Sequence, residues 1–282
     1  MTRRRLDAEM VRRRLADSRT TAQHLIAAHR VTVAGMTAQK PATQVEDSAA
    51  IEVIAGDQDD YVSRGAYKLI GALEAFEEVL PPLEGIRCLD AGASTGGFTD
   101  VLLRRGVGSV VAVDVGYGQL AWRLREDPRV EVLERTNIRH LTPDQIAPSP
   151  SLVVSDLSFI SLTKVIDNLR RCAPDALQIL MVKPQFEVGK GRVGSGGVVR
   201  DPQLRIEAVQ GVADFALRSG LEVWGVAPSP LPGPSGNVEY FLLLAPLGAT
   251  PALSDPPRSL TGEELSAAIH AAVENGPLGK ES

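Results

Sequence analysis

The sequence predicts an α/β protein with a mostly parallel sheet of seven strands, preceded by a small α+β unit. Three observations predict this class. Seven strand-like apolar runs follow residue 86, and helical patterns separate most of them. The first run leads into a glycine-rich turn that opens a helix. A basic segment at the start of the chain carries helical and strand patterns of its own.

Four parts are expected along the chain. They are a small α+β domain at 1–55, an interdomain linker at 56–63, the α/β domain at 64–246, and a Pro/Gly linker with a C-terminal helix at 247–282.

In the small domain, apolar spacing predicts helices over 5–15 and 19–29, with Ser18 as the N-cap of the second. The stretch RVTVAGM, 30–36, is typical of a strand that enters a tight turn. AIEVI, 50–54, predicts another strand.

A helix is expected in VSRGAYKLIGALEAF, residues 62–76, ahead of the sheet. Leu69, Ile70, Leu73 and Phe76 form the stripe of an amphipathic helix. Lys68 lies beside this stripe, so it is either a solvated lysine on the flank or a side chain that points into a site.

The strands of the sheet are expected at 86–91, 109–114, 130–133, 151–156, 176–183, 221–228 and 238–245. Only a Pro/Gly loop separates the last two, which are therefore expected to form an antiparallel pair at one end of the sheet. In the final helix, Thr261 and Glu264 predict a capping box.

Charge is distributed unevenly. The chain has a net charge of −5, yet its first 30 residues carry eight arginines against three acidic residues. A basic module on an acidic body suggests that one end of the protein handles a polyanion.

Several classes of protein are disfavoured. No apolar run reaches the ~18 residues of a membrane helix, and no secretory signal follows the basic N-terminus, so we expect a cytoplasmic protein without stable membrane insertion. Two cysteines are too few for a disulfide framework. Four scattered histidines without HExxH or CxxC predict no metal site.

The turn LDAGASTGGFT, 89–99, has several possible ligands, and a tight turn without a ligand is also possible. A dinucleotide loop needs GxGxxG, but Ser94 replaces the middle glycine. A P-loop needs GK[ST], but the Gly-Lys at 189–190 is followed by Gly191. GASTG formally matches the GxSxG nucleophile elbow of hydrolases, although it follows the first strand and its histidine would have to be His270.

An S-adenosylmethionine loop fits better. Asp114 ends the second strand, 24 residues after Asp90, where a carboxylate can accept hydrogen bonds from ribose hydroxyls. Asn137 follows the third strand and is placed to meet the adenine. The residues expected to bind the cofactor are Asp90, Gly92, Ser94, Thr95, Gly96, Gly97, Phe98, Asp114, Val115, Asn137 and Asp156.

Here the chain resembles a known family. The order Lys68, Asp156, Lys183, Glu239 resembles the K-D-K-E tetrad of FtsJ-like ribose 2'-O-methyltransferases. RGAYKL, DAGASTGGFT, DVGYGQLAWRLR, SDLSFISL, VKPQFEVGKG and PSGNVEYF together closely resemble the TlyA family, up to about residue 245. The N-terminal unit is similar to the RNA-binding domain named after ribosomal small-subunit protein S-four.

This resemblance implies a Rossmann-like class I methyltransferase fold and 2'-O-methylation of cytidines in small-subunit and often large-subunit rRNA. It also implies the hemolysin-like name of the family and a link to capreomycin susceptibility. The expected partner is rRNA or a ribosomal subunit, and a monomer is favoured.

The tetrad suits this chemistry, because a ribose hydroxyl is a poor nucleophile until it loses its proton. Lys183 is the candidate to take or electrostatically support that proton. Repulsion from nearby Lys68 would favour its neutral form, and Asp156 and Glu239 would orient both ammonium groups.

Candidate RNA-binding residues are Arg5, Arg19, Lys40, Arg64, Arg135 and Lys190. Arg5 and Arg19 are the strongest, and Lys190 belongs to a loop with five glycines that is expected to cover the substrate. Two other functions stay open, a membrane-active hemolysin and an RNA-binding assembly factor with an inactive methyltransferase fold.

Overall fold

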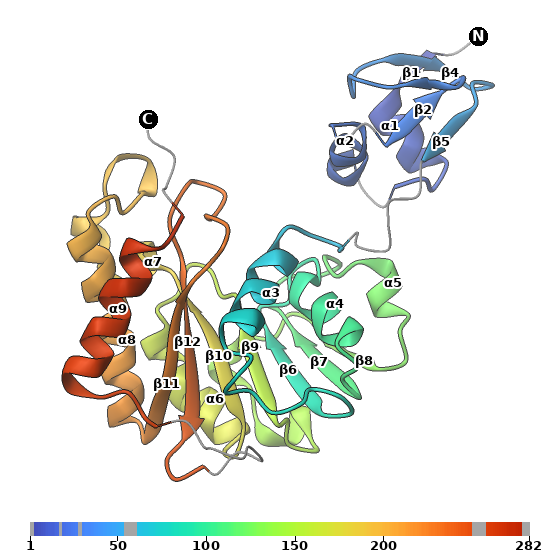
Figure 1. Cartoon of the computed structure of the whole chain (residues 1–282). Helices are drawn as coiled ribbons and strands as arrows, with labels where there is room; N and C mark the ends of the chain where they lie inside the picture. The colour runs from blue at the N-terminus through green and yellow to red at the C-terminus, as the bar shows by residue number, and fades with distance from the viewer. Residues whose placement is uncertain (1–2, 17–18, 28–29, 54–60, 250–257, 278–282) are drawn as a thin grey trace. The chain divides into compact units, whose positions relative to one another are not determined.

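The structure of the chain is a computed structural model that describes residues 3–16, 19–27, 30–53, 61–249 and 258–277. The chain divides into two compact units, 1–60 and 61–282 (Figure 1).

The second unit begins at Tyr61, within the expected linker. The Val62 backbone N–H donates to the Asp100 carboxylate (2.9 Å), and the Arg104 guanidinium lies 4.2 Å from the centre of the Tyr61 ring. These contacts attach the end of the expected linker to the second unit. Its remaining residues, 56–60, lie outside the described part of the chain.

The first unit contains two helices and two small sheets in its described residues. They are α1 (Leu6–Arg12), α2 (Arg19–Ala27), the pair β1 (Arg3–Arg5) and β4 (Gln44–Glu46), and the sheet β3-β2-β5 formed by Met36–Thr37, Val31–Val33 and Ile51–Val53. Ala34 and Gly35 both have positive φ, 50° and 77°, as a two-residue hairpin turn between β2 and β3 requires. Both helices and the strands β2 and β5 confirm the predictions.

Two features of this unit differ from the expectation or lie outside the described residues. Strands β1 and β4 were not predicted, because RRR and QVE carry no alternation of apolar residues. Ser18 lies outside the described residues. The core is small, and its buried residues are Leu6, Met10, Ala16, Ala22, Ile26, Val31, Ala38, Val45 and Ile51.

The second unit is built on one seven-stranded sheet with the order β11-β12-β10-β9-β6-β7-β8 (Figure 1). Its strands are β6 (Arg87–Ala91), β7 (Ser109–Val113), β8 (Val130–Leu133), β9 (Leu152–Ser155), β10 (Leu177–Val182), β11 (Leu221–Pro228) and β12 (Tyr240–Pro246). Strands β6 to β10 are parallel, and β12 is antiparallel to β10 and β11. Each predicted run overlaps one of these strands, and their ends agree to within two residues, so the predicted sheet and its antiparallel end are confirmed.

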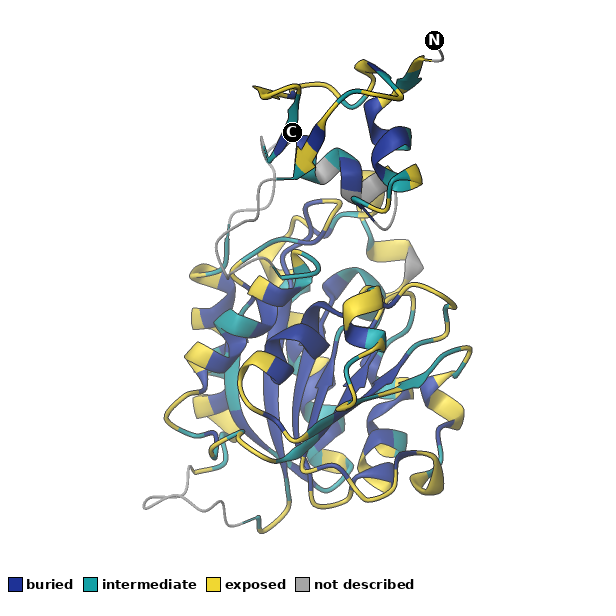
Figure 2. Ribbon diagram, turned by 90° about the vertical axis from the view of Figure 1, so that its right-hand side faces the viewer, coloured by how far each residue is buried: buried dark blue, intermediate teal, exposed yellow. Residues whose placement is uncertain are grey.

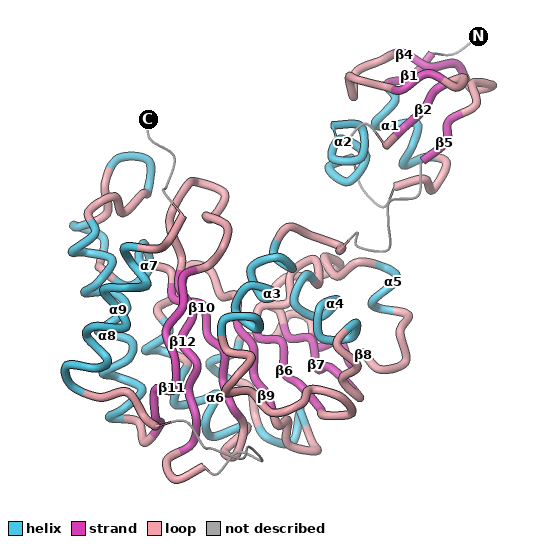
Figure 3. The backbone as a smooth tube through the Cα atoms, in the orientation of Figure 1, coloured by secondary structure: helices cyan, strands magenta, loops and turns pink. Residues whose placement is uncertain are grey.

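Helices cover both faces of this sheet (Figure 3). They are α3 (Gly65–Ala75), α4 (Gly97–Arg104), α5 (Trp122–Arg125), α6 (Ile166–Cys172), α7 (Pro184–Glu187), α8 (Pro202–Arg218) and α9 (Gly262–Glu274), with 3-10 turns η1 (Ile138–His140), η2 (Pro143–Ile146), η3 (Leu162–Lys164), η4 (Lys190–Arg192) and η5 (Ser195–Gly197).

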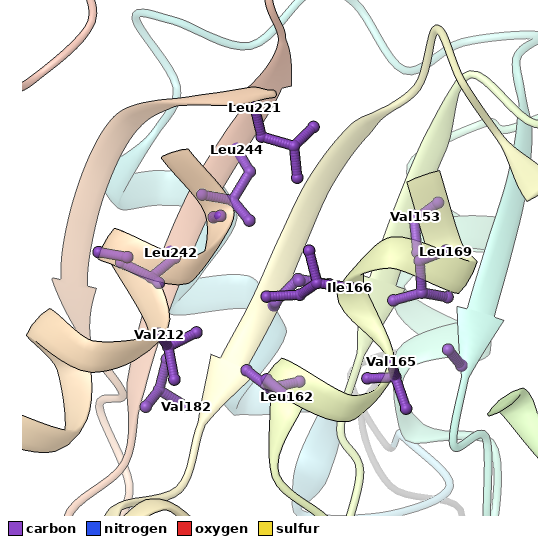
Figure 4. Packing of buried hydrophobic residues seen from close by; sticks show 14 of the residues in the cluster. Val153, Leu162, Val165, Ile166, Leu169, Val182, Val212, Leu221, Leu242 and Leu244 are labelled. Atoms are coloured by element: carbon purple, nitrogen blue, oxygen red, sulfur yellow. The ribbon is translucent and has the colours of Figure 1, made fainter. Parts of the chain in front are cut away.

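Two apolar layers sandwich the sheet, whose strands are mostly buried (Figure 2). Helices α6, α8 and α9 contribute to one layer, where Ile166 and Val212 lie close to Val182 and Leu242 (Figure 4). Helices α3 and α4 contribute to the other. This double covering explains why the parallel strands are continuous apolar runs in the sequence.

The predicted capping box of α9 does not form. Thr261 occupies the N-cap position with extended backbone angles, but its side chain makes no capping hydrogen bond. The Glu264 carboxylate instead lies 3.6 Å from the guanidinium of Arg258. None of the described helices combines the length and the apolar character that a membrane crossing needs.

Candidate active site

A cavity of about 300 Å³ lies where the parallel strands end, at the edge where open α/β sheets bind ligands. Its wall comes from segments that are far apart in the sequence. The lining residues are Ser63, Arg64, Gly65, Lys68, Gly92, Ala93, Ser94, Thr95, Gly97, Phe98, Asp156, Ser158, Lys183, Leu231, Pro232 and Pro234.

Lys68 points into this site rather than into solvent. It lies in the second turn of α3 and is 7% exposed, because the apolar stripe beside it packs onto the sheet. Its ammonium donates to the carboxylate of Glu239, which is 1% exposed and immediately precedes β12. A buried charge needs such a partner, so the pair fixes both side chains.

Lys183 and Asp156 form a second ion pair in the same cavity. They follow β10 and β9, which are neighbouring parallel strands, so the topology places them side by side. Lys183 is also 7% exposed, and its ammonium donates to the Ser158 hydroxyl at 3.0 Å. The four residues predicted as a tetrad are therefore brought together as two ion pairs, each with one lysine and one carboxylate.

The glycine turn is held tightly against its surroundings. Gly92 has a φ of +94°, and a side chain there would bring its Cβ to 2.8 Å from the Asp156 carbonyl oxygen. A Cβ on Gly97 would lie 2.3 Å from the Ser63 hydroxyl oxygen. Only glycine allows these approaches.

Asp114 holds the turn from outside the cavity. Its carboxylate accepts the backbone N–H groups of Ser94 (2.9 Å) and Gly116 (2.6 Å). Ser94 has a φ of +48°, which is rare for a residue other than glycine, and the hydrogen bond to Asp114 stabilises this conformation.

Asp90 is fully buried beneath the same turn. One carboxylate oxygen accepts the Thr99 hydroxyl at 2.7 Å. Burial, with the nearby charges of Asp156 and Asp114, raises the pKa of Asp90 to about 7. Asp90 therefore supports the turn instead of lining the cavity.

Of the predicted cofactor residues, six line this cavity, namely Gly92, Ser94, Thr95, Gly97, Phe98 and Asp156. Gly96 packs against Leu124. Val115 is exposed, and Asn137 caps η1 by accepting the backbone N–H of Arg139 at 3.0 Å.

The predicted RNA-binding residues are divided between the two units. Arg5 and Arg19 both bind the Asp7 carboxylate in the first unit. Lys40 is exposed in the same unit.

In the second unit, Arg64 lines the cavity. The Arg135 guanidinium lies 4.3 Å from the centre of the exposed Tyr117 ring. The side chain of Lys190 lies outside the described part of the chain.

Sequence reasoning missed Ser158, Phe159 and the loop with Leu231, Pro232 and Pro234. Phe159 follows the tetrad residue Asp156 closely, is 90% exposed and has a φ of +65°. The exposure of this ring and its backbone conformation are visible only in the structure, and in the sequence the motif SDLSFISL was noted only as a whole.

The residue Glu187 was also missed. It ends α7, which starts directly after Lys183, and its carboxylate accepts the Ser161 hydroxyl (2.5 Å) and the Leu162 backbone N–H (2.9 Å). Burial raises its pKa. Glu187 thus connects the segment after β10 to the segment after β9, and each segment carries one member of the Lys183–Asp156 pair.

A metal is not indicated by this geometry. Within the described residues, no three His, Cys, Asp or Glu side chains are grouped so that they could hold a metal ion.

Comparison with known proteins adds family evidence. A model of the FtsJ-like methyltransferase family matches residues 61–245, and a model of the S4 domain matches residues 4–51. The first match includes the cavity and both ion pairs.

Among curated proteins, the chain is 56% identical to the 16S/23S rRNA (cytidine-2'-O)-methyltransferase TlyA of Mycobacterium tuberculosis, over 97% of this chain and 98% of that protein. It is 37% identical to Hemolysin A of Brachyspira hyodysenteriae, over 84% of this chain and 98% of that protein. Among solved structures, a protein from Streptococcus thermophilus provisionally described as a hemolysin matches with a TM-score of 0.71 and 33% identity. That match covers 97% of this chain and 95% of the other.

Proposed function

This chain belongs to the FtsJ-like methyltransferase family and carries an S4 domain, and from that premise we propose that it methylates the ribose 2'-hydroxyl of cytidines in rRNA. We further propose S-adenosylmethionine as the methyl donor, 16S rRNA as a substrate and 23S rRNA as a second one. The observation that carries this proposal is the meeting of Lys68, Asp156, Lys183 and Glu239 beside the glycine turn.

The cavity fits the methyl donor in size and charge. About 300 Å³ is at the lower end of the range of small-molecule sites. The carboxylate of Asp156 lines the cavity, and that of Asp114 accepts the backbone N–H of Ser94 in the cavity wall, so the negative charge here suits a cationic sulfonium. The first backbone N–H groups of α4, which starts at Gly97, suit the carboxylate of the amino-acid part.

S-adenosylmethionine supplies an activated methyl group on a positively charged sulfur. The chain's own residues must then align the ribose hydroxyl and remove its proton. Lys183 is the base in this proposal: its side-chain nitrogen, which lines the cavity between Asp156 and Ser158, takes the hydroxyl proton as the neutral amine and becomes the ammonium. A proton received there is stabilised by the Asp156 carboxylate.

Lys68 has a different role, because Glu239 neutralises it within a buried pair. Its ammonium donates hydrogen bonds at the cavity wall, where it favours an alkoxide on the substrate. The S4 unit supplies the contact to rRNA through its arginines, and such a substrate places the enzyme in the cytoplasm.

Two relatives carry the name hemolysin, but a name by itself identifies no site on this chain that competes with the one described. The buried ion pairs are not expected for a protein that only binds RNA, since each buried lysine and carboxylate costs desolvation energy that a non-catalytic fold could avoid with apolar residues.

Nucleoside analysis tests this function. The full-length protein is incubated with isotopically labelled S-adenosylmethionine and ribosomal subunits or purified rRNA, and the RNA is digested. The expected labelled product is 2'-O-methylcytidine. Label on a base, or no label with any of these substrates, contradicts the proposed function.

A further inference from the structure

A single buried carboxylate connects two arginines of the S4 unit. Asp7 is fully buried, and one of its oxygens accepts Nε of Arg5 at 3.0 Å while the other accepts Nη2 of Arg5 at 2.9 Å. The second oxygen also accepts Nη2 of Arg19 and Nε2 of Gln23, both at 3.0 Å. Arg5 precedes α1 and Arg19 opens α2, so the carboxylate joins the starts of both helices.

These bonds leave both arginines available for a further partner. A guanidinium has five N–H donors, of which Arg5 gives two to Asp7 and Arg19 gives one. The two side chains are 44% and 56% exposed. With one aspartate between two arginines, the cluster keeps a net positive charge, and its cations are fixed in position on one carboxylate.

We propose that Asp7 is a positioning residue that holds Arg5 and Arg19 as a paired grip for the phosphate backbone of rRNA. This role rests on the proposed rRNA methylation and specifies how the S4 unit contributes to it. Phosphate suits such a pair, because a guanidinium binds its oxygens through parallel N–H bonds whose direction matters.

If Asp7 had only a structural role, it would need fewer hydrogen-bond partners. One guanidinium is enough to neutralise Asp7, yet the chain directs two toward it together with an amide. The neighbouring guanidinium groups hold the pKa of Asp7 well below its usual range, so the carboxylate stays charged at any physiological pH. The carboxylate therefore stays able to accept hydrogen bonds from both arginines.

The variant Asp7→Asn distinguishes a positioning role of Asp7 from the effect of its negative charge on RNA binding. It removes one negative charge from a unit that binds a polyanion, so electrostatics alone predicts tighter RNA binding. A positioning role predicts the reverse, about 5- to 10-fold weaker binding, because each arginine released from residue 7 must be ordered when the RNA binds. Loss of one or two phosphate contacts should also reduce the log–log salt slope of affinity by about 0.7 to 0.9 per contact.

Glu52→Gln is the matched control, since Glu52 is exposed on β5 and its loss changes the net charge by the same amount. Binding of the full-length proteins to rRNA is measured against salt concentration, with thermal unfolding as the check on folding. Weaker binding by Asp7→Asn than by Glu52→Gln supports the positioning role. Equal or tighter binding overturns it.

If Asp7→Asn does not fold, the double variant Arg5→Lys, Arg19→Lys decides. Lysine keeps each charge but not the fork, so the positioning role predicts at least 5-fold weaker binding, and unchanged binding overturns it. Methyl transfer by the unaltered protein is measured in parallel. A failure of that reaction counts against the proposed function. Normal methyl transfer, together with Asp7 variants whose RNA binding is unchanged, counts only against this inference.

Discussion

The ammonium of Lys68 and the carboxylate of Glu239 form a buried ion pair although 171 positions separate them in the sequence. The pair joins α3, which precedes the sheet, to β12, which is inserted between β10 and β11. Formation of this contact requires α3 to pack on the sheet and β12 to pair within it, so the pair links the fold to the site.

Glu239→Gln should therefore destabilise the protein, because it leaves Lys68 buried without a counter-charge. Breaking a buried pair in this way costs about 3–5 kcal/mol. Denaturant unfolding measures the loss. The double variant Lys68→Met, Glu239→Gln removes both charges and should recover a large part of that stability. Equal stability of Glu239→Gln and the unaltered protein would contradict the buried pair.

Glu187→Ala should slow methyl transfer by about 10²-fold, because the segments that carry Lys183 and Asp156 lose their outer connection and small misplacements of reacting groups are costly. Glu187→Gln should restore most of the rate, since its amide oxygen can accept from Leu162 and its amide nitrogen can donate to Ser161. Single-turnover rates with saturating cofactor are the measurement. If Glu187→Ala keeps the normal single-turnover rate, or if Glu187→Gln fails to restore it, Glu187 has no positioning role.

The sequence was sufficient for most of the fold because its parallel strands are buried on both faces. All six residues of β10 are buried, and such runs are recognisable without tertiary information. Strand β1 was not predictable in this way. Its three arginines are at least partly exposed and form ion pairs, for example Arg3 with Glu46 on β4. Nothing in RRR distinguishes such a strand from a basic tail.

Asp90 should make stability depend on pH in a defined window. Its pKa is raised to about 7, so between pH ~4 and ~7 the folded protein keeps a proton that the unfolded chain releases. Its contribution is therefore full below pH ~4 and is lost as the pH rises to ~7. A difference of about three pKa units limits this effect to about 4 kcal/mol.

The variant Asp90→Asn keeps an acceptor for Thr99 but cannot titrate. Both tryptophans, Trp122 and Trp224, lie in the second unit, so their fluorescence follows its unfolding. The stability of the variant relative to the unaltered protein should increase from pH 4 to pH 7 and then stay constant. A difference that does not change with pH would exclude a raised pKa at Asp90.

Asp114→Ala should weaken binding of S-adenosylmethionine about 10-fold or more, because Ser94 and Gly116 lose their common acceptor and the glycine turn can relax. Calorimetry on the full-length protein measures the affinity. Asp144→Ala is the matched control, since Asp144 is an exposed aspartate in η2. If both variants bind equally well, Asp114 does not organise the cofactor site.

The four residues of the tetrad could be named from the sequence, but the way in which they pair could not. Lys68, Asp156, Lys183 and Glu239 could be selected from their order and motifs, but which lysine meets which carboxylate depends on side-chain positions in the folded protein. The same limit applies to Asp7, whose two arginines were proposed as RNA ligands before their shared carboxylate was visible.

The most direct test of the central claim is the single-turnover rate of ribose methylation by Lys183→Ala, measured together with its affinity for S-adenosylmethionine. Lys164→Ala is the control, because Lys164 is an exposed lysine at the end of η3. A base at Lys183 predicts a rate lower by about 10²–10⁴ with unchanged cofactor affinity, while the control keeps the normal rate. A near-normal rate for Lys183→Ala would show that another group removes the ribose proton and would contradict the account of the site.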